Sequence, residues 1–157
     1  MRLDANGGLS EGQARLWLEN CDCINNYSQS SAKIEFIEQP LGVDKLQLML
    51  TLNRDYQTAI ALDESVATLN QLKDCYQQGW RGIFVIKPGI AGYISRLRQF
   101  CQEEQIDVVF SSMLETTIGR QAALQLAREL TIKPRAVGFG VSHWFTENEE
   151  IWLRQLW

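Results

Sequence analysis

Polar residues end a series of short apolar runs, and three of them are carboxylates that could bind a metal ion. These residues are Asp4, Glu38, Asp63, Lys87 and Ser111. From Glu38 onward they are spaced 24 or 25 residues apart. Carboxylate oxygens with no thiol or imidazole beside them select Mg²⁺ or Mn²⁺ rather than Zn²⁺. The three carboxylates therefore predict a magnesium or manganese site.

The apolar runs are predicted to be buried strands. They cover residues 2–4, 34–38, 59–63, 82–87, 107–111 and 136–141. Several, such as Ile83–Ile86, are apolar without alternation, which is typical of strands covered on both faces in a parallel sheet. Because one polar residue ends each successive strand, these side chains are expected to meet at the carboxyl ends of the strands.

The segments between the runs have helical spacing. Apolar residues recur at i, i+3, i+4 and i+7 in two sets, which are Ala14, Trp17, Leu18 and Cys21, and Ala123, Leu126, Ala127 and Leu130. Ser10 with Gln13 and Thr68 with Gln71 fit the capping box that begins a helix, and Gly79 suits a helix end. About six strand and helix units thus predict a single α/β domain over residues 1–157.

A closed barrel fits this pattern better than a dinucleotide-binding sheet. Neither Asn6-Gly7-Gly8 nor Gly138-Phe139-Gly140 completes the glycine fingerprint of a dinucleotide-binding sheet. A (β/α)8 barrel normally has eight units in about 250 residues. The chain has 157 residues. The prediction is therefore a partial TIM-type barrel without its first two strands.

Composition excludes several other classes of protein. A net charge of -4 gives no reason to expect nucleic acid or an anionic membrane as a partner. No signal peptide or membrane-spanning run is present, so a cytoplasmic protein with reduced cysteines is expected. Cys21 and Cys23 should point to opposite faces of a helix, which argues against zinc. His143 is the only histidine, which removes histidine-based triads.

Lys87 follows an apolar run and precedes Pro88. Its ammonium group should therefore emerge at the rim of the strands. A cation in that place can stabilise an anion that develops during a reaction. Beside a divalent metal, it would stabilise the enediolate formed when a carboxylate substrate loses its α-proton.

Short segments in this order resemble the enolase superfamily, in its muconate-lactonizing subgroup. Residues 3–7 (LDANG), 36–40 (FIEQP), 61–65 (ALDES) and 85–88 (VIKP) are similar to the ends of its third to sixth barrel strands. Residues 110–115 (FSSMLE), followed by 117–119 (TIG), resemble the seventh strand and following helix of o-succinylbenzoate synthases. The resemblance covers the whole chain and implies barrel strands three to eight.

The resemblance also implies a role for each site residue. It implies that Asp4, Glu38 and Asp63 bind Mg²⁺ and that Lys87 faces the substrate ring, where it stabilises the enediolate. Ser111 and Ser112 would hold the succinyl end of the substrate. Asn6 and Glu64 would orient the ligands or pair with a lysine.

The implied reaction is the syn-dehydration of 2-succinyl-6-hydroxy-2,4-cyclohexadiene-1-carboxylate to o-succinylbenzoate, a step toward menaquinone or phylloquinone. Three enzymes of the same subgroup are alternatives: a dipeptide epimerase, an N-acylamino acid racemase and a muconate-type cycloisomerase. A non-catalytic fragment is an alternative from a different class.

The chain departs from the family in one respect that bears on catalysis. The family's base is a lysine in a K-x-K motif on the second barrel strand, and this sequence contains no K-x-K. The N-terminal capping domain is expected to be missing as well. Little turnover is therefore expected from the chain alone, and self-association or a complementing N-terminal segment is predicted.

Overall fold

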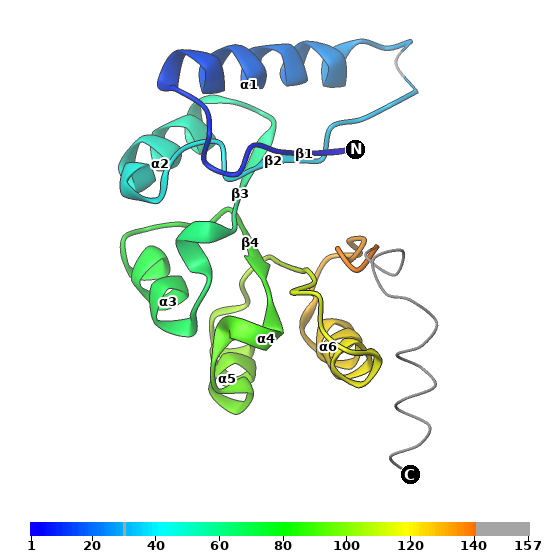
Figure 1. Ribbon diagram of the computed structural model, residues 1–157. Helices are drawn as coiled ribbons and strands as arrows, with labels where there is room; N and C mark the ends of the chain where they lie inside the picture. Colours follow the sequence, from blue (N-terminus) through cyan, green and yellow to red (C-terminus); the bar gives the residue numbers. More distant parts are fainter. Residues whose placement is uncertain (30, 141–157) are drawn as a thin grey trace. The chain divides into compact units, whose positions relative to one another are not determined.

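The computed structural model describes residues 1–29 and 31–140 (Figure 1). The chain divides into two compact units, Met1–Val85 and a second that begins at Ile86. His143 and the end of the predicted sixth strand lie outside the described residues. The prediction of one domain over residues 1–157 stays a prediction.

Parallel strands in chain order form the centre of the first unit. They are β1 (Arg2–Asp4), β2 (Phe36–Glu38), β3 (Ala59–Leu62) and the first three residues of β4 (Ile83–Ile86). Each strand leads into helical segments, which are α1 (Glu11–Asn26), η1 (Val43–Lys45), α2 (Leu46–Asp55), η2 (Glu64–Val66) and α3 (Leu69–Gln77). The predicted alternation of strand and helix is confirmed in this unit.

Two helices of the first unit begin at the predicted capping boxes. The Ser10 hydroxyl accepts from the Gln13 amide, and the Gln13 side chain accepts from the Ser10 amide at 2.9 Å. Thr68 and Gln71 make the same reciprocal pair, again with a 2.9 Å return bond. Because each box satisfies amides that a helix start leaves unpaired, it fixes where α1 and α3 begin.

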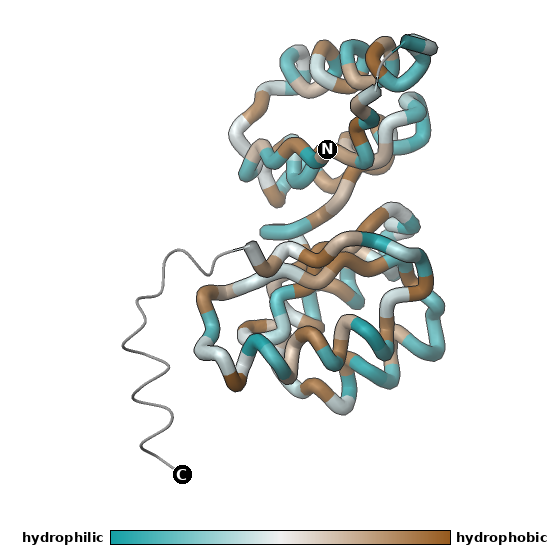
Figure 2. Tube along the Cα trace, turned by 90° about the vertical axis from the view of Figure 1, so that its right-hand side faces the viewer, coloured by the Kyte–Doolittle hydropathy of each residue, from teal (hydrophilic) through white to brown (hydrophobic). Residues whose placement is uncertain are grey.

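Strands β2, β3 and β4 are mostly buried, as the runs without alternation predicted, whereas β1 is only partly buried because it lies at the edge of the sheet. Phe36, Ile37, Ile60 and Leu62 are fully buried. Full burial of a side chain such as Phe36 stabilises the fold by roughly 1.5–3 kcal/mol. Figure 2 shows the complementary pattern in the helices, where hydrophobic and hydrophilic residues alternate along the chain. Trp17, predicted on the buried face of α1, is instead 37% exposed.

The second unit contains the last residue of β4, strand β5 (Val108–Phe110) and three helices. The helices are α4 (Pro88–Ala91), α5 (Ile94–Glu104) and α6 (Thr117–Leu130). The Ser111 amide, just after β5, donates to the Ile86 carbonyl at 2.9 Å. The ends of the two strands are thereby joined.

The predicted sixth strand is wrong for residues 136–140, where the structure has only a parallel bridge between Ser111 and Gly138. Gly138 donates to the Phe110 carbonyl at 2.8 Å and accepts from the Ser112 amide at 3.0 Å. A strand requires this pairing to continue over several residues. Here it is limited to the neighbours of one glycine.

All four cysteines are free thiols, as predicted. On α1, Cys21 is buried and Cys23 is exposed, which confirms that the two side chains point to different faces. In α5, burial raises the pKa of Cys101 to about 12. In the part of the chain that the structure describes, no helix is long and apolar enough to cross a membrane.

Candidate functional site

Two of the predicted metal ligands face each other at the end of the first two strands. In the β1 and β2 register, Asp4 pairs with Glu38, and Glu38 in turn pairs with Ala61 of β3. Paired residues of a parallel sheet direct their side chains to the same face. Asp63 directly follows β3, two positions after Ala61. The structure thus places the three carboxylates at the carboxyl ends of three neighbouring strands.

Asp4 is exposed, and its carboxylate is held by the turn that follows it. Its Oδ1 accepts from the backbone amide of Asn6 at 3.0 Å. Asn6 and Gly7 have positive φ angles of 46° and 71°, so the chain reverses sharply behind the carboxylate. Asn6 therefore contacts the predicted ligand, but its recorded bond to Asp4 comes from the backbone.

Asp63 is buried, with 3% of its surface exposed. Its amide donates to Oε1 of Gln39 at 3.0 Å, and its carbonyl accepts from the Val66 amide at 2.9 Å. These two bonds fix the backbone that carries the carboxylate. Sequence reasoning gave no role to Gln39, although it stands between Glu38 and Pro40 in the FIEQP segment.

Glu64 has a buried carboxylate oxygen to which a cation could bind. It lies half-buried at the start of η2, and its Oε2 is buried without a hydrogen-bond partner among the described residues. A buried carboxylate oxygen is costly unless a positive charge or a donor approaches it. A metal ion or a lysine ammonium near the end of β3 would satisfy this oxygen.

The donor set and the strand-end placement fit Mg²⁺, but the side chains do not form a ready-made cluster. Within the described ranges, no group of three or more Asp, Glu, His or Cys side chains is arranged to hold a metal ion. The assignment of Asp4, Glu38 and Asp63 as ligands therefore stays a prediction.

In the second unit, Lys87 occupies the strand end that the sequence predicted. It follows β4 and is the N-cap of α4, with Pro88 at the first helical position. Its carbonyl accepts from the amides of Ile90 and Ala91 at 3.0 and 3.1 Å. The backbone of Lys87 is therefore fixed by the helix start, and its half-buried side chain extends from a rigid position.

Ser111 and Ser112 lie together at the end of β5, against Gly138. The Ser111 hydroxyl donates to the Gly138 carbonyl at 3.3 Å. A Cβ atom at Gly138 would lie 2.7 Å from the same hydroxyl, which is closer than such atoms approach. Gly138 is thus required for this arrangement, and it was missed because the sequence does not reveal which backbone reaches Ser111.

Glu115 organises the loop that follows Ser112. Its Oε2 accepts from the Ser112 hydroxyl at 2.9 Å and from the Met113 amide at 2.7 Å. The Ser112 hydroxyl also accepts from the Leu114 amide at 3.0 Å. Sequence reasoning gave Glu115 no role, although its position three residues after a serine matches the capping-box pattern. The Ser112 hydroxyl oxygen and Oε2 of Glu115 are therefore both engaged in hydrogen bonds that hold the loop.

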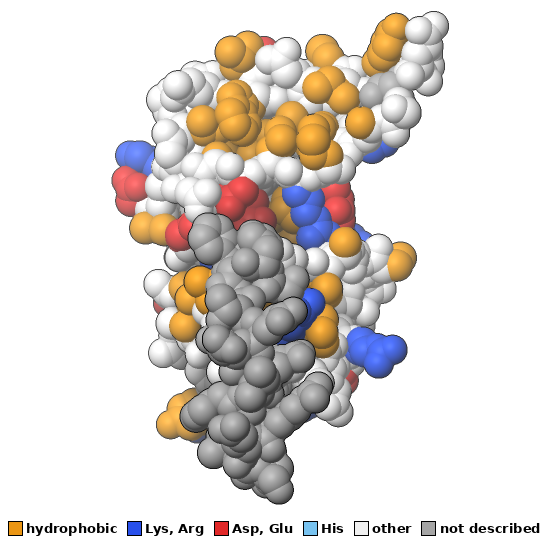
Figure 3. All heavy atoms as spheres, turned by 45° about the vertical axis from the view of Figure 1, so that its right-hand side comes forward, with side chains coloured by type: hydrophobic (Ala, Val, Ile, Leu, Met, Phe, Trp, Pro, Cys, Tyr) orange, Lys and Arg blue, Asp and Glu red, His pale blue; other side chains and the backbone are white. Residues whose placement is uncertain are grey.

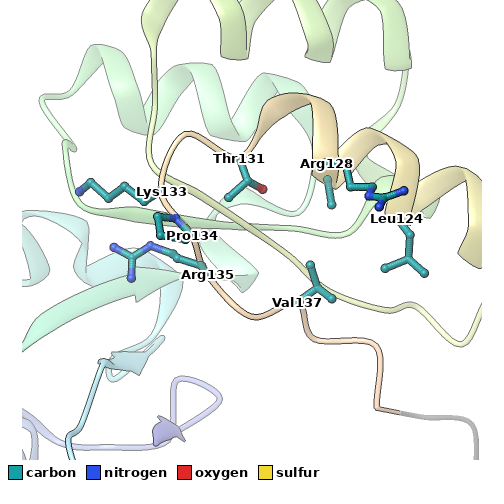
Figure 4. A pocket seen from close by; sticks show the side chains of 8 residues that line it. Leu124, Arg128, Thr131, Lys133, Pro134, Arg135 and Val137 are labelled. Carbon is teal, nitrogen blue, oxygen red and sulfur yellow. The ribbon is translucent and has the colours of Figure 1, made fainter.

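A cleft of about 440 Å³ in the second unit lies apart from these residues (Figure 4). Its lining residues are Leu124, Ala127, Arg128, Thr131, Lys133, Pro134, Arg135 and Val137. Arg135 and Lys133 both bind the Asp107 carboxylate. Burial raises the pKa of Asp107, but the hydrogen bonds from Arg135 and Lys133 outweigh it and leave that pKa below its usual value. No predicted site residue lines this cleft.

Parallel strands in chain order, each followed by a helix and ending in polar side chains, define the class of protein as part of a (β/α) barrel with its site at the carboxyl ends of the strands. The family described as enolase C-terminal domain-like matches residues 1–151. The chain belongs to this family.

A sequence and a solved structure from Thermosynechococcus strain BP-1 are similar to almost the whole chain. The o-succinylbenzoate synthase of Thermosynechococcus vestitus is 38% identical over 98% of this chain and 49% of its own length. The structure of o-succinylbenzoate synthase from Thermosynechococcus elongatus BP-1, complexed with Mg in the active site, has a TM-score of 0.78 and 36% identity over the same shares. The chain thus spans about half the length of these relatives.

An epimerase of known structure is also similar to this chain, with lower sequence identity and a lower TM-score. The L-Ala-D/L-Glu epimerase from Bacillus subtilis has a TM-score of 0.69 and 27% identity, over 90% of this chain and 38% of that protein. The predicted family and the predicted partial barrel are confirmed by these comparisons.

Proposed function

We propose that this chain is the metal-binding portion of an o-succinylbenzoate synthase-like lyase. The observation that carries the proposal is the placement of Asp4, Glu38 and Asp63 at the ends of three neighbouring parallel strands, with Asp4 and Glu38 in direct register. The identity of 38% to a synthase over nearly the whole chain supports the same reaction. That reaction is the syn-dehydration of 2-succinyl-6-hydroxy-2,4-cyclohexadiene-1-carboxylate, a small carboxylate.

Asp4, Glu38 and Asp63 would hold Mg²⁺, or Mn²⁺ in its place. The bound ion would withdraw charge from the substrate carboxylate and so make the α-proton more acidic. Lys87, in the second unit, would supply a positive charge that stabilises the enediolate formed when the proton leaves. Asn6 and Glu64 would orient the ligands.

Ser111 and Ser112 would seat the succinyl end of the substrate. The Ser111 amide is bonded to Ile86 and the Ser112 amide to Gly138, while the two hydroxyls donate to Gly138 and Glu115, so this segment is held in place. Either hydroxyl would exchange its present acceptor for the substrate in order to donate to it. The proposal includes a role in menaquinone or phylloquinone biosynthesis and a cytoplasmic location.

The proposal includes a requirement for a second segment. The sequence contains no K-x-K, and a second copy would lack the motif too, so we propose that the base that removes the α-proton comes from a complementing N-terminal segment. In the described sheet β1 pairs with β2 only, which leaves its other edge open. Figure 3 shows hydrophobic side chains gathered on the surface of the first unit. A strand added beside β1 would pair with its open edge.

Epimerisation of a dipeptide or racemisation of an N-acylamino acid is the second candidate. The structural similarity to the Bacillus subtilis epimerase favours it, because the same fold supports proton removal beside a carboxylate in both reactions. The synthase is preferred because its identity to this chain is higher and covers more of it.

Complementation in trans tests the function. The chain is co-expressed with the part of the Thermosynechococcus vestitus synthase that it does not match, and the purified pair is assayed with the cyclohexadiene substrate and with a panel of dipeptides. Dehydration that requires Mg²⁺ and is lost in Asp63→Asn supports the synthase. Epimerisation without dehydration supports the second candidate, and inactivity on both substrate classes from a folded pair contradicts both.

A further inference from the structure

Gln39 connects the three strand ends at which the predicted metal ligands lie. It directly follows Glu38, the last residue of β2, and is fully buried. Its carbonyl accepts from the Gly7 amide at 2.7 Å, in the turn behind Asp4. Its amide donates to the Ala61 carbonyl at 2.8 Å, in β3. The backbone of one residue therefore ties the end of β2 to both of its neighbours.

The side chain of Gln39 extends this connection to the backbone of Asp63. Its Oε1 accepts from the amides of Asp63 and Ser65 at 3.0 and 3.3 Å. Its Nε2 donates to the Ser65 hydroxyl at 2.8 Å and to the Leu41 carbonyl at 2.9 Å. A carboxamide has two donor hydrogens and one acceptor oxygen, and all of them are engaged. No other uncharged side chain of this size offers both a donor and an acceptor in these directions.

The backbone of Gln39 has a conformation that its side-chain bonds must maintain. Its φ angle is 35°, in the left-handed region that residues other than glycine rarely adopt. Unusual backbone of this kind persists where the surroundings hold it, and it is concentrated at functional sites. At Gln39 the surroundings are the turns that follow β1, β2 and β3.

We propose that Gln39 is the positioning residue of the metal site. It fixes the backbone of Asp63 against the strand that carries Glu38, and it anchors the turn behind Asp4. The backbone positions that carry the three carboxylates are thereby held in place before any ion arrives. This inference rests on the metal assignment in the proposed function. Residues that orient ligands in this way typically change metal affinity about 10- to 100-fold when they are replaced.

Hydrogen exchange tests the positioning role without any metal. In Gln39→Met, which has a similar length but no hydrogen-bonding groups, the Asp63 and Ser65 amides lose their acceptor. Their exchange rates in the full chain, followed by NMR, are expected to rise at least about tenfold relative to amides of α1. Ser65→Ala removes a single partner of the same carboxamide and should give a smaller rise at Asp63. It also serves if Gln39→Met does not fold.

A matched control separates positioning from general stability. Thr58→Val alters another buried polar residue, 2% exposed, whose hydroxyl bonds to Asp22 at the opposite end of β3. It should destabilise the chain without selectively raising exchange at Asp63. Equal protection of the Asp63 amide in wild type and Gln39→Met would overturn the proposal, as would an equal rise in Thr58→Val.

Mn²⁺ affinity, measured by calorimetry on the same proteins, connects Gln39 to the site. We expect about 10- to 100-fold weaker binding in Gln39→Met and unchanged binding in Thr58→Val at temperatures where both are folded. A wild-type chain that binds no Mn²⁺, or whose binding is indifferent to Asp63→Asn, overturns the metal assignment and this role with it. Binding that needs Asp63 but is unchanged in Gln39→Met overturns the role of Gln39 alone.

Discussion

Asp4 and Glu38 are paired residues across β1 and β2, so two carboxylates project from the same face at the ends of adjacent strands. Like charges placed opposite each other in a sheet destabilise it. The arrangement makes chemical sense if a cation lies between or near the two groups. The pair is therefore a geometric feature that supports the proposed metal site.

Asp4→Asn should weaken Mn²⁺ binding while leaving the fold intact. The amide oxygen of the new side chain can still accept from the Asn6 amide, and the site is exposed, so stability should change by less than about 0.5 kcal/mol. Loss of one charged ligand should raise the Kd for Mn²⁺ in calorimetry. Asp44→Asn is the control, since it removes an exposed carboxylate that pairs with Lys45 in η1. Equal affinities in the two variants would exclude Asp4 as a ligand.

Asp107 should make the stability of the chain depend on acid pH. Its folded pKa is lowered, because the hydrogen bonds of Arg135 and Lys133 outweigh the effect of burial. A lowered folded pKa means that the stabilisation is fully present above the unfolded value, near 3.9, and is lost as pH falls through the folded value. In urea unfolding, Asp107→Asn should cost about 1–3 kcal/mol at pH 7. Its deficit should shrink below about pH 4.

The hydrogen bonds of Asp107 are short, and those from Arg135 are bidentate. Their strength determines how much stability Asp107→Asn is expected to lose. Arg135 donates to both carboxylate oxygens, at 2.9 and 2.7 Å, and Lys133 donates at 2.8 Å. Glu103→Gln on α5 is the control, since it removes an acid that accepts from the nearby uncharged Gln99. A deficit for Asp107→Asn that is independent of pH would show that packing, and not charge, explains its effect.

Gly138→Ala should disturb the close contact between Ser111 and Gly138, whereas Gly140→Ala should not. A Cβ at Gly138 would meet the Ser111 hydroxyl at 2.7 Å, while one at Gly140 would meet nothing within 4 Å among the described residues. Forcing an extra methyl group into a packed site typically costs about 1–3 kcal/mol. Urea unfolding of the two variants measures the difference. In the complemented enzyme, Gly138→Ala should also raise the KM, and identical behaviour of the variants would contradict the assigned contact.

The strands and the helix starts could be predicted because their causes are local. Five apolar runs became β1 to β5, since runs without alternation are suited to burial on both faces. The capping boxes at Ser10 and Thr68 act within three residues, so the sequence contains all of their parts. The run at residues 136–140 is also largely apolar but contains two glycines, and it forms only a bridge, because its pairing depends on which loop lies beside it.

The charged residues proposed for the site could be predicted from the sequence, but the residues that hold the neighbouring backbone in place could not. Asp63 could be recognised because it ends an apolar run. The role of Gln39 depends on contacts between its buried carboxamide and turns that are distant in the sequence. No local sequence pattern predicts such contacts. Gly138 poses the same difficulty, because a glycine needed for close approach resembles any other loop glycine until its neighbour is known.

Cys23 should be the one thiol that reacts rapidly in the folded chain. It is exposed, whereas Cys21, Cys75 and Cys101 are buried and burial raises the pKa of each, to about 12 for Cys101. Because the thiolate is the reactive form, the buried groups need unfolding before they react. Titration with a disulfide reagent near pH 8 should give one fast equivalent, removed in Cys23→Ser, and four in urea. Two fast equivalents would contradict the burial of the others.

Lys87→Ala should remove turnover from the complemented enzyme without removing the metal. The backbone of Lys87 caps α4 through its carbonyl, so loss of the side chain should leave the helix start in place. Loss of one group that stabilises a developing anion typically lowers kcat about 10²- to 10³-fold. Mn²⁺ affinity should stay within about twofold, since an ammonium is not a ligand for a cation. Lys45→Ala, which removes an exposed lysine of η1, is the control for charge. A kcat that is unchanged in Lys87→Ala while Asp63→Asn is inactive would place the anion-stabilising charge on another residue.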